Sequence, residues 1–222
     1  MYKNVLFDLD GTLTDPGEGI TASVAYALNK LGITPPPREE LYKFIGPPLG
    51  ESFMKYYSLS EDEARVAIEY YREYFKPRGM LENKVYPDIP KLLKALRAQG
   101  LRLIVATSKP EVFAVTILEH FGLAEHFDLI AGSDLSGTRI LKADVIRDAL
   151  CRCGITALDE CIMIGDRLHD VEGAAEVGID SVGVLWGYGS HRELTEAGAV
   201  YIAESVFDIM KIISHHGKSK RS

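Results

Sequence analysis

Five short apolar runs are spread along the chain, and each is bounded by polar or turn-forming residues. Within each run, apolar side chains follow one another almost continuously instead of alternating with polar ones. Strands of a parallel sheet have this pattern because both of their faces are covered. We therefore predict five buried strands, at Asn4–Leu9, Leu101–Thr107, Phe127–Ala131, Cys161–Gly165 and Ser181–Trp186.

Between these runs, apolar residues recur at the three- and four-residue spacing of amphipathic helices. Two of these faces precede Gly100 and Gly122, and a glycine just past a helix end is a common stop because it adopts the left-handed conformation at little cost. The predicted helical segments include residues 89–96, 112–118, 142–152 and 171–177. The alternation of strand and helix predicts an α/β fold with a doubly wound parallel five-stranded sheet, a Rossmann-like core.

One stretch interrupts this alternation. Residues 16–81 show helical faces and no convincing strand, and one helix begins at the capping-box pattern Ser60-Glu61-Asp62-Glu63. We predict that residues 16–81 form an inserted α-helical cap domain and that residues 1–15 and 82–214 form the core. Residues 215–222 end in a basic segment without apolar anchors, which predicts a disordered tail.

The amino-acid composition limits the kinds of binding partner and the cellular compartment that we expect for this chain. The 222 residues include 25 basic and 32 acidic side chains, a net charge of −7, which argues against a nucleic-acid or anionic-membrane partner. No apolar run reaches the roughly 18 residues of a membrane span, and the N-terminus lacks a signal-peptide pattern. Three clustered cysteines argue against a disulfide framework and favour a cytoplasmic location. A monomer or weak homodimer is the default expectation.

Polar residues gather where the predicted strands end. In an open α/β sheet, ligands bind beyond the carboxyl ends of the strands. The residues concerned are Asp8, Asp10, Gly11, Thr12, Thr107, Ser108, Asp166 and Asp170, with Lys142 at the start of a predicted helix. Four carboxylates could therefore meet at one edge of the sheet.

Carboxylates that converge repel one another unless a cation holds them or one takes up a proton. A ligand set made only of oxygen, without histidine or cysteine, favours a hard ion, Mg²⁺ before Zn²⁺. Magnesium held by few carboxylates keeps positions open for water and a phosphate. Thr107, Lys142 and the backbone amides of the Gly11–Thr12 turn could supply the donors that a phosphate needs.

Four sequence features occur together and in order: FDLDGTLTD at the first strand, Thr-Ser-Lys-Pro at the second, Lys142, and IGDRLHD at the fourth. In order, spacing and position, they resemble the haloacid dehalogenase superfamily of phosphatases. The resemblance covers nearly the whole chain. The position of the insertion is similar to that in the helical-cap branch, and the chain looks nearest to phosphoglycolate phosphatase-like proteins.

The resemblance implies a role for each matching residue. Asp8 would attack phosphorus and form an aspartyl-phosphate, and Asp10 would protonate the leaving alkoxide and later accept a proton from water. Thr107, with Ser108 beside it, would bind phosphoryl oxygens, and Lys142 would draw off their charge.

The resemblance also implies a metal site. Asp166 would bind Mg²⁺ together with the carboxylate of Asp8 and the backbone carbonyl of Asp10. Asp170 would act on the water shell of the metal or orient its neighbours.

Each residue has a structural alternative when it is taken alone. Asp8 and Asp10 could cap a turn, and a single lysine such as Lys142 is usually solvated. Asp166 and Asp170 could simply be acids favoured at a helix start by its dipole. Their combination in one chain favours the functional interpretation.

The expected activity is Mg²⁺-dependent hydrolysis of a small phosphorylated metabolite, of phosphoglycolate phosphatase-like or nucleotidase-like type. The cap would select the substrate, because the core contacts only the phosphate. A phosphomutase on the same core remains open, as does a non-catalytic phosphate-sensing module. The cap tyrosines could stack on a nucleobase, but amphipathic packing is the favoured interpretation; they are Tyr42, Tyr56, Tyr57, Tyr70, Tyr71 and Tyr74.

Overall fold

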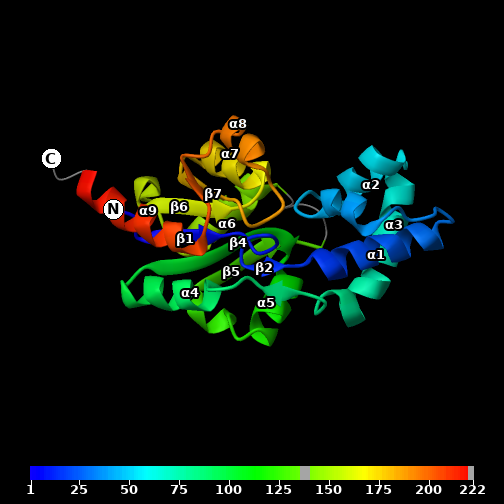
Figure 1. Ribbon diagram of the computed structural model, residues 1–222, viewed down its shortest axis with the longest axis horizontal. Helices are drawn as coiled ribbons and strands as arrows, with labels where there is room; N and C mark the ends of the chain where they lie inside the picture. The colour runs from blue at the N-terminus through cyan, green and yellow to red at the C-terminus, as the bar shows by residue number, and fades with distance from the viewer. Residues whose placement is uncertain (136–140, 220–222) are drawn as a thin grey trace. The chain divides into compact units, whose positions relative to one another are not determined.

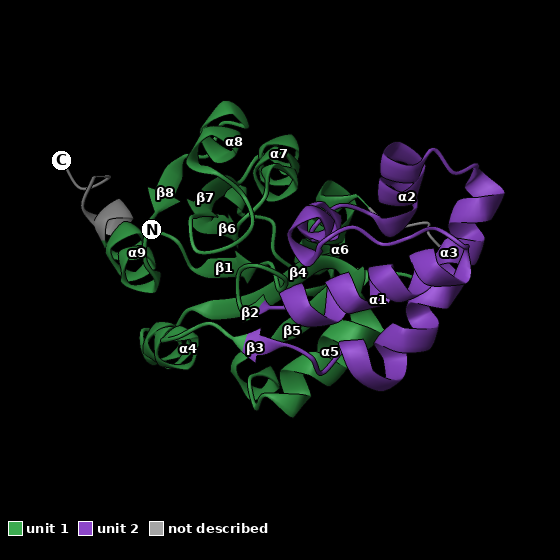
Figure 2. Cartoon of the chain, turned by 45° about the vertical axis from the view of Figure 1, so that its right-hand side comes forward, with its two compact units in different colours: residues 1–14, 85–222 green, residues 15–84 purple. Residues whose placement is uncertain are grey.

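The computed structural model describes residues 1–135 and 141–219 (Figure 1). The chain divides into two compact units (Figure 2). Unit 1 comprises Met1–Thr14 and Val85–Ser222, and unit 2 comprises Asp15–Lys84. Sequence patterning places the insertion at residues 16–81, so the observed unit begins one residue earlier and ends three residues later.

A six-stranded sheet forms the centre of unit 1, in the order β5-β4-β1-β6-β7-β8. All five neighbouring pairs are parallel. The strands are β1 (Asn4–Phe7), β4 (Arg102–Pro110), β5 (Leu129–Ser133), β6 (Cys161–Gly165), β7 (Asp180–Val184) and β8 (Tyr201–Ala203). The predicted α/β class and parallel sheet are confirmed, but the predicted number of strands was wrong, because β8 adds a sixth strand beside β7.

Helices cover both faces of this sheet. Figure 1 shows α7 and α8 on one face and α4 and α5 on the other. The helices of unit 1 are α4 (Ile89–Ala98), α5 (Glu111–His120), α6 (Lys142–Arg152), α7 (Leu168–Val177), α8 (His191–Glu196) and α9 (Val206–Ser219), with short 3₁₀ turns η3 (Ala124–His126) and η4 (Leu158–Glu160). The periodicity-based predictions of α4, α5, α6 and α7 therefore agree with the structure.

The hydrophobic core explains why the strand patterns are continuous. All four residues of β1 and all five of β6 are buried. Leu6 and Met163 pack on one face against Val145 and Ile146 of α6. Because successive side chains of a strand point to opposite faces, a strand covered on both sides must be apolar at nearly every position.

Unit 2 is mainly helical. It contains α1 (Gly17–Lys30), the 3₁₀ helix η1 (Arg38–Phe44), α2 (Leu49–Tyr57), α3 (Glu61–Tyr74) and the π-helix η2 (Phe75–Gly79). Ser60 and Glu63 form the predicted capping box at the start of α3. Two short strands, β2 (Thr14–Asp15) and β3 (Lys84–Val85), form a two-stranded sheet at the points where the chain passes from one unit to the other.

Two remaining predictions concern the C-terminus and membranes. Helix α9 continues to Ser219, into the segment 215–222 that is predicted to be disordered, and residues 220–222 lie outside the described residues. Across residues 1–135 and 141–219, no helix has both the length and the apolar character that a bilayer crossing requires.

Candidate active site

The first part of the site is the turn that follows β1. The backbone N–H of Asp8 donates to the carbonyl of Ile164 at 2.9 Å, which extends the pairing of β1 with β6 by one residue. The chain then turns, and the N–H of Gly11 donates to the carbonyl of Thr14 at 2.8 Å. Gly11 has φ +83°, and a Cβ there would lie 2.2 Å from Oδ2 of Asp166. The turn therefore needs glycine both for its conformation and for this close approach.

The second part follows β6. Asp166 is fully buried, and its Oδ2 accepts a hydrogen bond from the backbone N–H of Tyr188 at 2.7 Å. Its Oδ1 lies 3.4 Å from the Thr12 hydroxyl, which donates to it. Asp170 is in the first turn of α7, and its Oδ2 accepts from the backbone N–H of Arg167 at 3.1 Å.

The strand order brings these two parts together. Strands β1 and β6 are neighbours, and the chain winds outward from them in both directions, so their carboxyl ends form the topological switch point of the sheet. Asp8, Asp166 and Asp170 are buried there, and each offers a ligand atom within 4.8 Å of those of the other two. Sequence reasoning expected these carboxylates to converge, and the structure does bring them together.

Lys142 completes the centre of this cluster. It is the first residue of α6, and it is buried. Its Nζ lies 2.7 Å from Oδ1 of Asp8 and 2.7 Å from Oδ1 of Asp170, and it donates to the carbonyl of Ala106 at 3.0 Å. Burial by itself would lower the pKa of this ammonium, but the carboxylates of Asp170 and Asp8 outweigh burial and raise the pKa above its usual value. Lys142 therefore carries a fixed positive charge at neutral pH.

One ammonium does not balance three buried carboxylates. Burial raises the pKa of Asp166 well above its ordinary value, and the charges of Asp170 and Asp8 raise it further. Burial also raises the pKa of Asp170 to about 6, although Lys142 opposes this effect. The cluster has the oxygen donors and the excess negative charge that suit a hard divalent cation.

Asp10 lies beside this cluster and has its own partner. Its Oδ2 is 2.9 Å from Nζ of Lys109, and both side chains are buried. Its Oδ1 is also buried and makes no hydrogen bond within residues 1–135 and 141–219. Burial raises the pKa of Asp10, with the opposing effect of Lys109 and the added effect of Asp8. Lys109 is the lysine of the Thr-Ser-Lys-Pro feature, to which the sequence analysis assigned no role, so this pairing was missed.

The phosphate-site candidates of β4 lie one strand away from β1. The register pairs Phe7 with Val105, and Thr107 follows Val105 by two residues. Thr107 is buried, and its hydroxyl oxygen accepts from the backbone N–H of Lys109 at 3.3 Å. The half-buried Ser108 comes next, within a strand that continues to Pro110 rather than ending at Thr107. Thr107 and Ser108 therefore lie on the strand next to β1, and within residues 1–135 and 141–219 they make no hydrogen bond to the carboxylates.

The segment after β7 also belongs to the site, and sequence reasoning missed it. The indole N–H of Trp186 donates to the carbonyl of Thr12 at 3.1 Å, and Tyr188 reaches Asp166 through its backbone N–H. A Cβ at Gly187 would lie 2.4 Å from the Cβ of Asp166. Apart from the Trp186 indole, these contacts depend on a backbone N–H and on the absence of a side chain at Gly187, so the available sequence signal was the glycine spacing in Trp186-Gly187-Tyr188-Gly189.

Comparison with known proteins agrees with this arrangement. The family model for haloacid dehalogenase-like hydrolases matches residues 5–184. The chain is 46% identical over 215 residues to a 5′-nucleotidase of Pseudomonas aeruginosa, covering 97% of each protein. It is also 46% identical over 186 residues to the tyrosine-protein kinase PtkA of Mycobacterium tuberculosis, covering 83% of this chain and 62% of that one.

Solved structures give the same result. A structure described as that of a predicted phosphatase from Clostridium acetobutylicum superposes with a TM-score of 0.94 and is 54% identical. The match covers 97% of this chain and 99% of that one. The predicted resemblance is thereby confirmed: the chain belongs to the haloacid dehalogenase-like hydrolase family.

Proposed function

We propose that this chain is a Mg²⁺-dependent phosphatase that hydrolyses small phosphomonoesters through an aspartyl-phosphate on Asp8. The observation that carries the proposal is the setting of Asp8. Its Oδ1 lies 2.7 Å from the Lys142 ammonium, and its ligand atom lies within 4.8 Å of those of Asp166 and Asp170. A carboxylate is a weak nucleophile in water, so a buried position beside a fixed cation suits it for attack on phosphorus.

The residues present fit magnesium. We assign Asp8, Asp166 and the backbone carbonyl of Asp10 as its protein ligands. The cluster offers oxygen atoms only, and its buried negative charge exceeds what Lys142 balances, as the raised pKa values of Asp166 and Asp170 indicate. When bound, Mg²⁺ supplies positive charge to the phosphoryl oxygens and aligns them with the nucleophile. Asp170 is engaged by Lys142 and by the N–H of Arg167, so we assign it a supporting role.

In the first step, a carboxylate oxygen of Asp8 forms a bond to phosphorus while the bond from phosphorus to the ester oxygen breaks. The Lys142 ammonium, 2.7 Å from Oδ1 of Asp8, lies ready to offset the charge on the phosphoryl group. Asp10 donates a proton to the departing alkoxide. Its buried Oδ1 has no hydrogen-bond partner in the described part of the chain, so it is available to a substrate oxygen.

In the second step, water attacks the phosphorus of the aspartyl-phosphate. Asp10, now ionised, takes a proton from that water, and the bond between phosphorus and Asp8 breaks to release inorganic phosphate. Lys109, 2.9 Å from Oδ2 of Asp10, stabilises this ionised form. We assign Thr107, Ser108 and the amides of Gly11 and Thr12 to the remaining phosphoryl oxygens.

The substrate class depends on which unit contacts which part of the substrate. The residues of unit 1 account for the phosphoryl group alone, so we assign the choice of leaving group to unit 2. The similarity to a protein named 5′-nucleotidase supports nucleoside monophosphates as the first candidates. Phosphoglycolate and sugar phosphates follow, and we infer a cytoplasmic enzyme that acts alone or as a weak dimer.

Phosphate release from a substrate panel tests the proposal. The panel contains nucleoside monophosphates, phosphoglycolate, sugar phosphates and p-nitrophenyl phosphate, each with Mg²⁺ and with EDTA. We expect release that requires Mg²⁺ and falls at least 10³-fold in Asp8→Asn, since the nucleophile is then lost. Asp144→Asn is the matched control, because Asp144 pairs with Arg147 on the exposed side of α6 and, in the part of the chain that the structure describes, forms no ion pair with the cluster.

Two outcomes would contradict the proposal. Release that persists in Asp8→Asn would show that Asp8 is not the nucleophile. Absence of release from every ester would reject a general phosphatase and favour a phosphomutase, provided that the protein still became phosphorylated on Asp8.

A further inference from the structure

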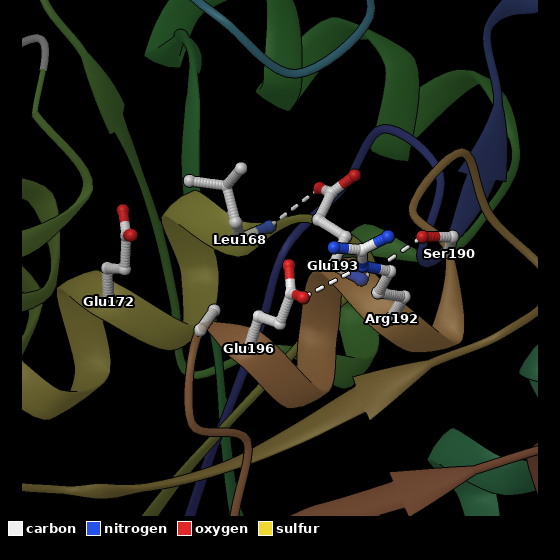
Figure 3. Close-up of a pocket in the computed structure, with 7 residues that line it drawn as sticks. Leu168, Glu172, Ser190, Arg192, Glu193 and Glu196 are labelled. Atoms are coloured by element: carbon white, nitrogen blue, oxygen red, sulfur yellow. Dashed lines mark hydrogen bonds and ion pairs between the residues drawn. The ribbon is translucent and has the colours of Figure 1, made fainter.

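The loop that carries Asp166 and Asp170 is held by a carboxylate outside the metal cluster. Glu193 belongs to α8, and its Oε1 accepts two hydrogen bonds from the start of α7. One comes from Nε of Arg167 at 2.8 Å, and the other comes from the backbone N–H of Leu168 at 3.0 Å. Figure 3 shows the Glu193 side chain directed from α8 to Leu168. Arg167 and Leu168 are the first two of the three residues between Asp166 and Asp170.

This contact lies in a partly shielded place. The Arg167 and Glu193 side chains are 15% and 21% exposed, whereas the Arg192–Glu196 pair on the same helix is 84% and 64% exposed. Charged hydrogen bonds shielded from water are stronger and less screened by salt than those on the surface. The Glu193 contact can therefore fix the loop, and the Arg192–Glu196 pair contributes little.

Because Glu193 makes this contact, the capping box at the start of its own helix α8 stays incomplete. Ser190-His191-Arg192-Glu193 is a capping-box sequence, and the Ser190 hydroxyl accepts from the Glu193 N–H at 3.1 Å as such a box requires. In a complete box, as at Ser60 and Glu63 of α3, the glutamate carboxylate returns to the N–H of the cap residue. The carboxylate of Glu193 turns instead to the start of α7.

The N-terminus of α7 consequently has two carboxylate caps. Asp170 accepts from the N–H of Arg167, and Glu193 accepts from the N–H of Leu168. Without Glu193, the Leu168 N–H and the Nε of Arg167 would each lose the acceptor described above. Both changes loosen the peptide units between Asp166 and Asp170.

We propose that Glu193 is a positioning residue for the metal site, and that its carboxylate fixes the loop from Asp166 to Asp170 so that Asp166 is preorganised for Mg²⁺. This inference rests on the proposed function, because it needs Mg²⁺ to bind at Asp166. Residues that orient a metal ligand from outside the coordination sphere typically change metal affinity or activity 10- to 100-fold when they are removed.

The test measures Mg²⁺ binding without turnover. The Mg²⁺-dependent rise in melting temperature is recorded over a range of Mg²⁺ concentrations, and a dissociation constant is fitted for each variant. We expect Glu193→Ala to weaken Mg²⁺ binding about 10-fold or more. Glu193→Gln should lie between Glu193→Ala and the unmodified chain, because its amide oxygen still accepts from Leu168 but faces Arg167 without charge.

Glu196→Gln is the matched control. It removes a carboxylate from the same helix. Glu196 also lines the same surface hollow, of about 350 Å³, as Glu193 and Leu168. Among the ion pairs described, the substitution breaks only the Arg192–Glu196 pair. We expect its Mg²⁺ dissociation constant to stay within twofold of that of the unmodified chain. Saturating Mg²⁺ should restore phosphatase activity to both Glu193 variants, which loss of general stability would not allow.

The outcomes separate the inference from the proposed function. If the unmodified chain binds Mg²⁺ and both Glu193 variants bind it within twofold as well, the positioning role is overturned and the metal site stands. If the unmodified chain shows no Mg²⁺-dependent shift, the metal site and the positioning role are both overturned. If Glu193→Ala does not fold, the isosteric Glu193→Gln decides the question.

Discussion

A methyl group added at Gly11 tests the geometry of the site most directly. The Cβ of Gly11→Ala would lie 2.2 Å from Oδ2, 2.5 Å from Cγ and 2.7 Å from Oδ1 of Asp166. Gly178, at the end of α7, provides a matched control. Its φ of +86° is close to the +83° of Gly11, but a Cβ there would meet nothing nearer than Leu158 Cδ1 at 3.9 Å. Both substitutions place an alanine in the left-handed conformation, but only Gly11→Ala also brings a Cβ into steric clash with Asp166.

The expected free energies follow from these contacts. An alanine in the left-handed conformation costs about 1–2 kcal/mol, which both variants incur. In Gly11→Ala the Asp166 carboxylate must also move by about an ångström to reach normal contact distance. That movement breaks its 2.7 Å bond from the Tyr188 N–H, and a hydrogen bond to a charged group contributes about 1.5–3 kcal/mol. We therefore expect losses of about 1–2 kcal/mol for Gly178→Ala and about 2.5–5 kcal/mol for Gly11→Ala.

Urea denaturation with and without Mg²⁺ measures the stability difference, and kcat/KM on p-nitrophenyl phosphate measures the effect on catalysis. A misplacement of about 1 Å in a catalytic group can lower the rate about 10²-fold, so we expect a loss of that size in Gly11→Ala. Gly178→Ala should keep kcat/KM within about twofold. Equal stability and equal activity of the two variants would refute the close approach of Gly11 to Asp166 and the role assigned to that carboxylate.

Three further predictions concern charge and proton transfer. Lys142→Met leaves Asp8 and Asp170 without their ammonium, so urea denaturation in EDTA should show a loss of about 3–5 kcal/mol, and a smaller one in Mg²⁺. Burial raises the pKa of Asp170 from 3.8 to about 6, so its folded form holds the proton more tightly. In the metal-free chain Asp170 should therefore contribute a loss of about 3 kcal/mol as the pH rises from about 4 to 6, in addition to the losses from the raised pKa values of Asp10 and Asp166, and Asp170→Asn should remove its share; an unchanged pH profile would contradict it. Asp10→Asn should release one equivalent of p-nitrophenol in a burst and then stall. The reason is that this leaving group needs no general acid, whereas attack of water on the aspartyl-phosphate needs a general base. Steady turnover at the original rate would exclude Asp10 as that base.

Strong local patterns predicted most of the fold. The helices α4 to α7 have clear apolar periodicity, and Ser60 with Glu63 marks the start of α3. Strand β8 was missed because Tyr201–Ala203 is only three residues long, and its pairing with β7 depends on a neighbour distant in sequence. The strands β2 and β3 have two residues each, which is too short for any period to appear.

Some residues of the candidate site could likewise be predicted from the sequence, and others could not. Asp8, Asp10 and Asp166 follow apolar strands directly, so strand polarity alone brings them to one edge of the sheet. Lys142 was identified through the resemblance, because a lysine that opens a helix has no distinguishing pattern. Lys109 and Glu193 act through side chains whose targets lie about 100 and 26 residues away, and such partners depend on tertiary packing rather than on local sequence.

The paired crossing strands β2 and β3 have a consequence for how such a chain can diversify. Because they are hydrogen-bonded neighbours, the polypeptide leaves unit 1 and returns to it at adjacent points. An insertion with adjacent ends places little constraint on its host, so the segment between them can be lengthened, shortened or exchanged as a cassette. A graft of the corresponding segment from another family member between Thr14 and Val85 is therefore a practical route to a new specificity that leaves the aspartates untouched.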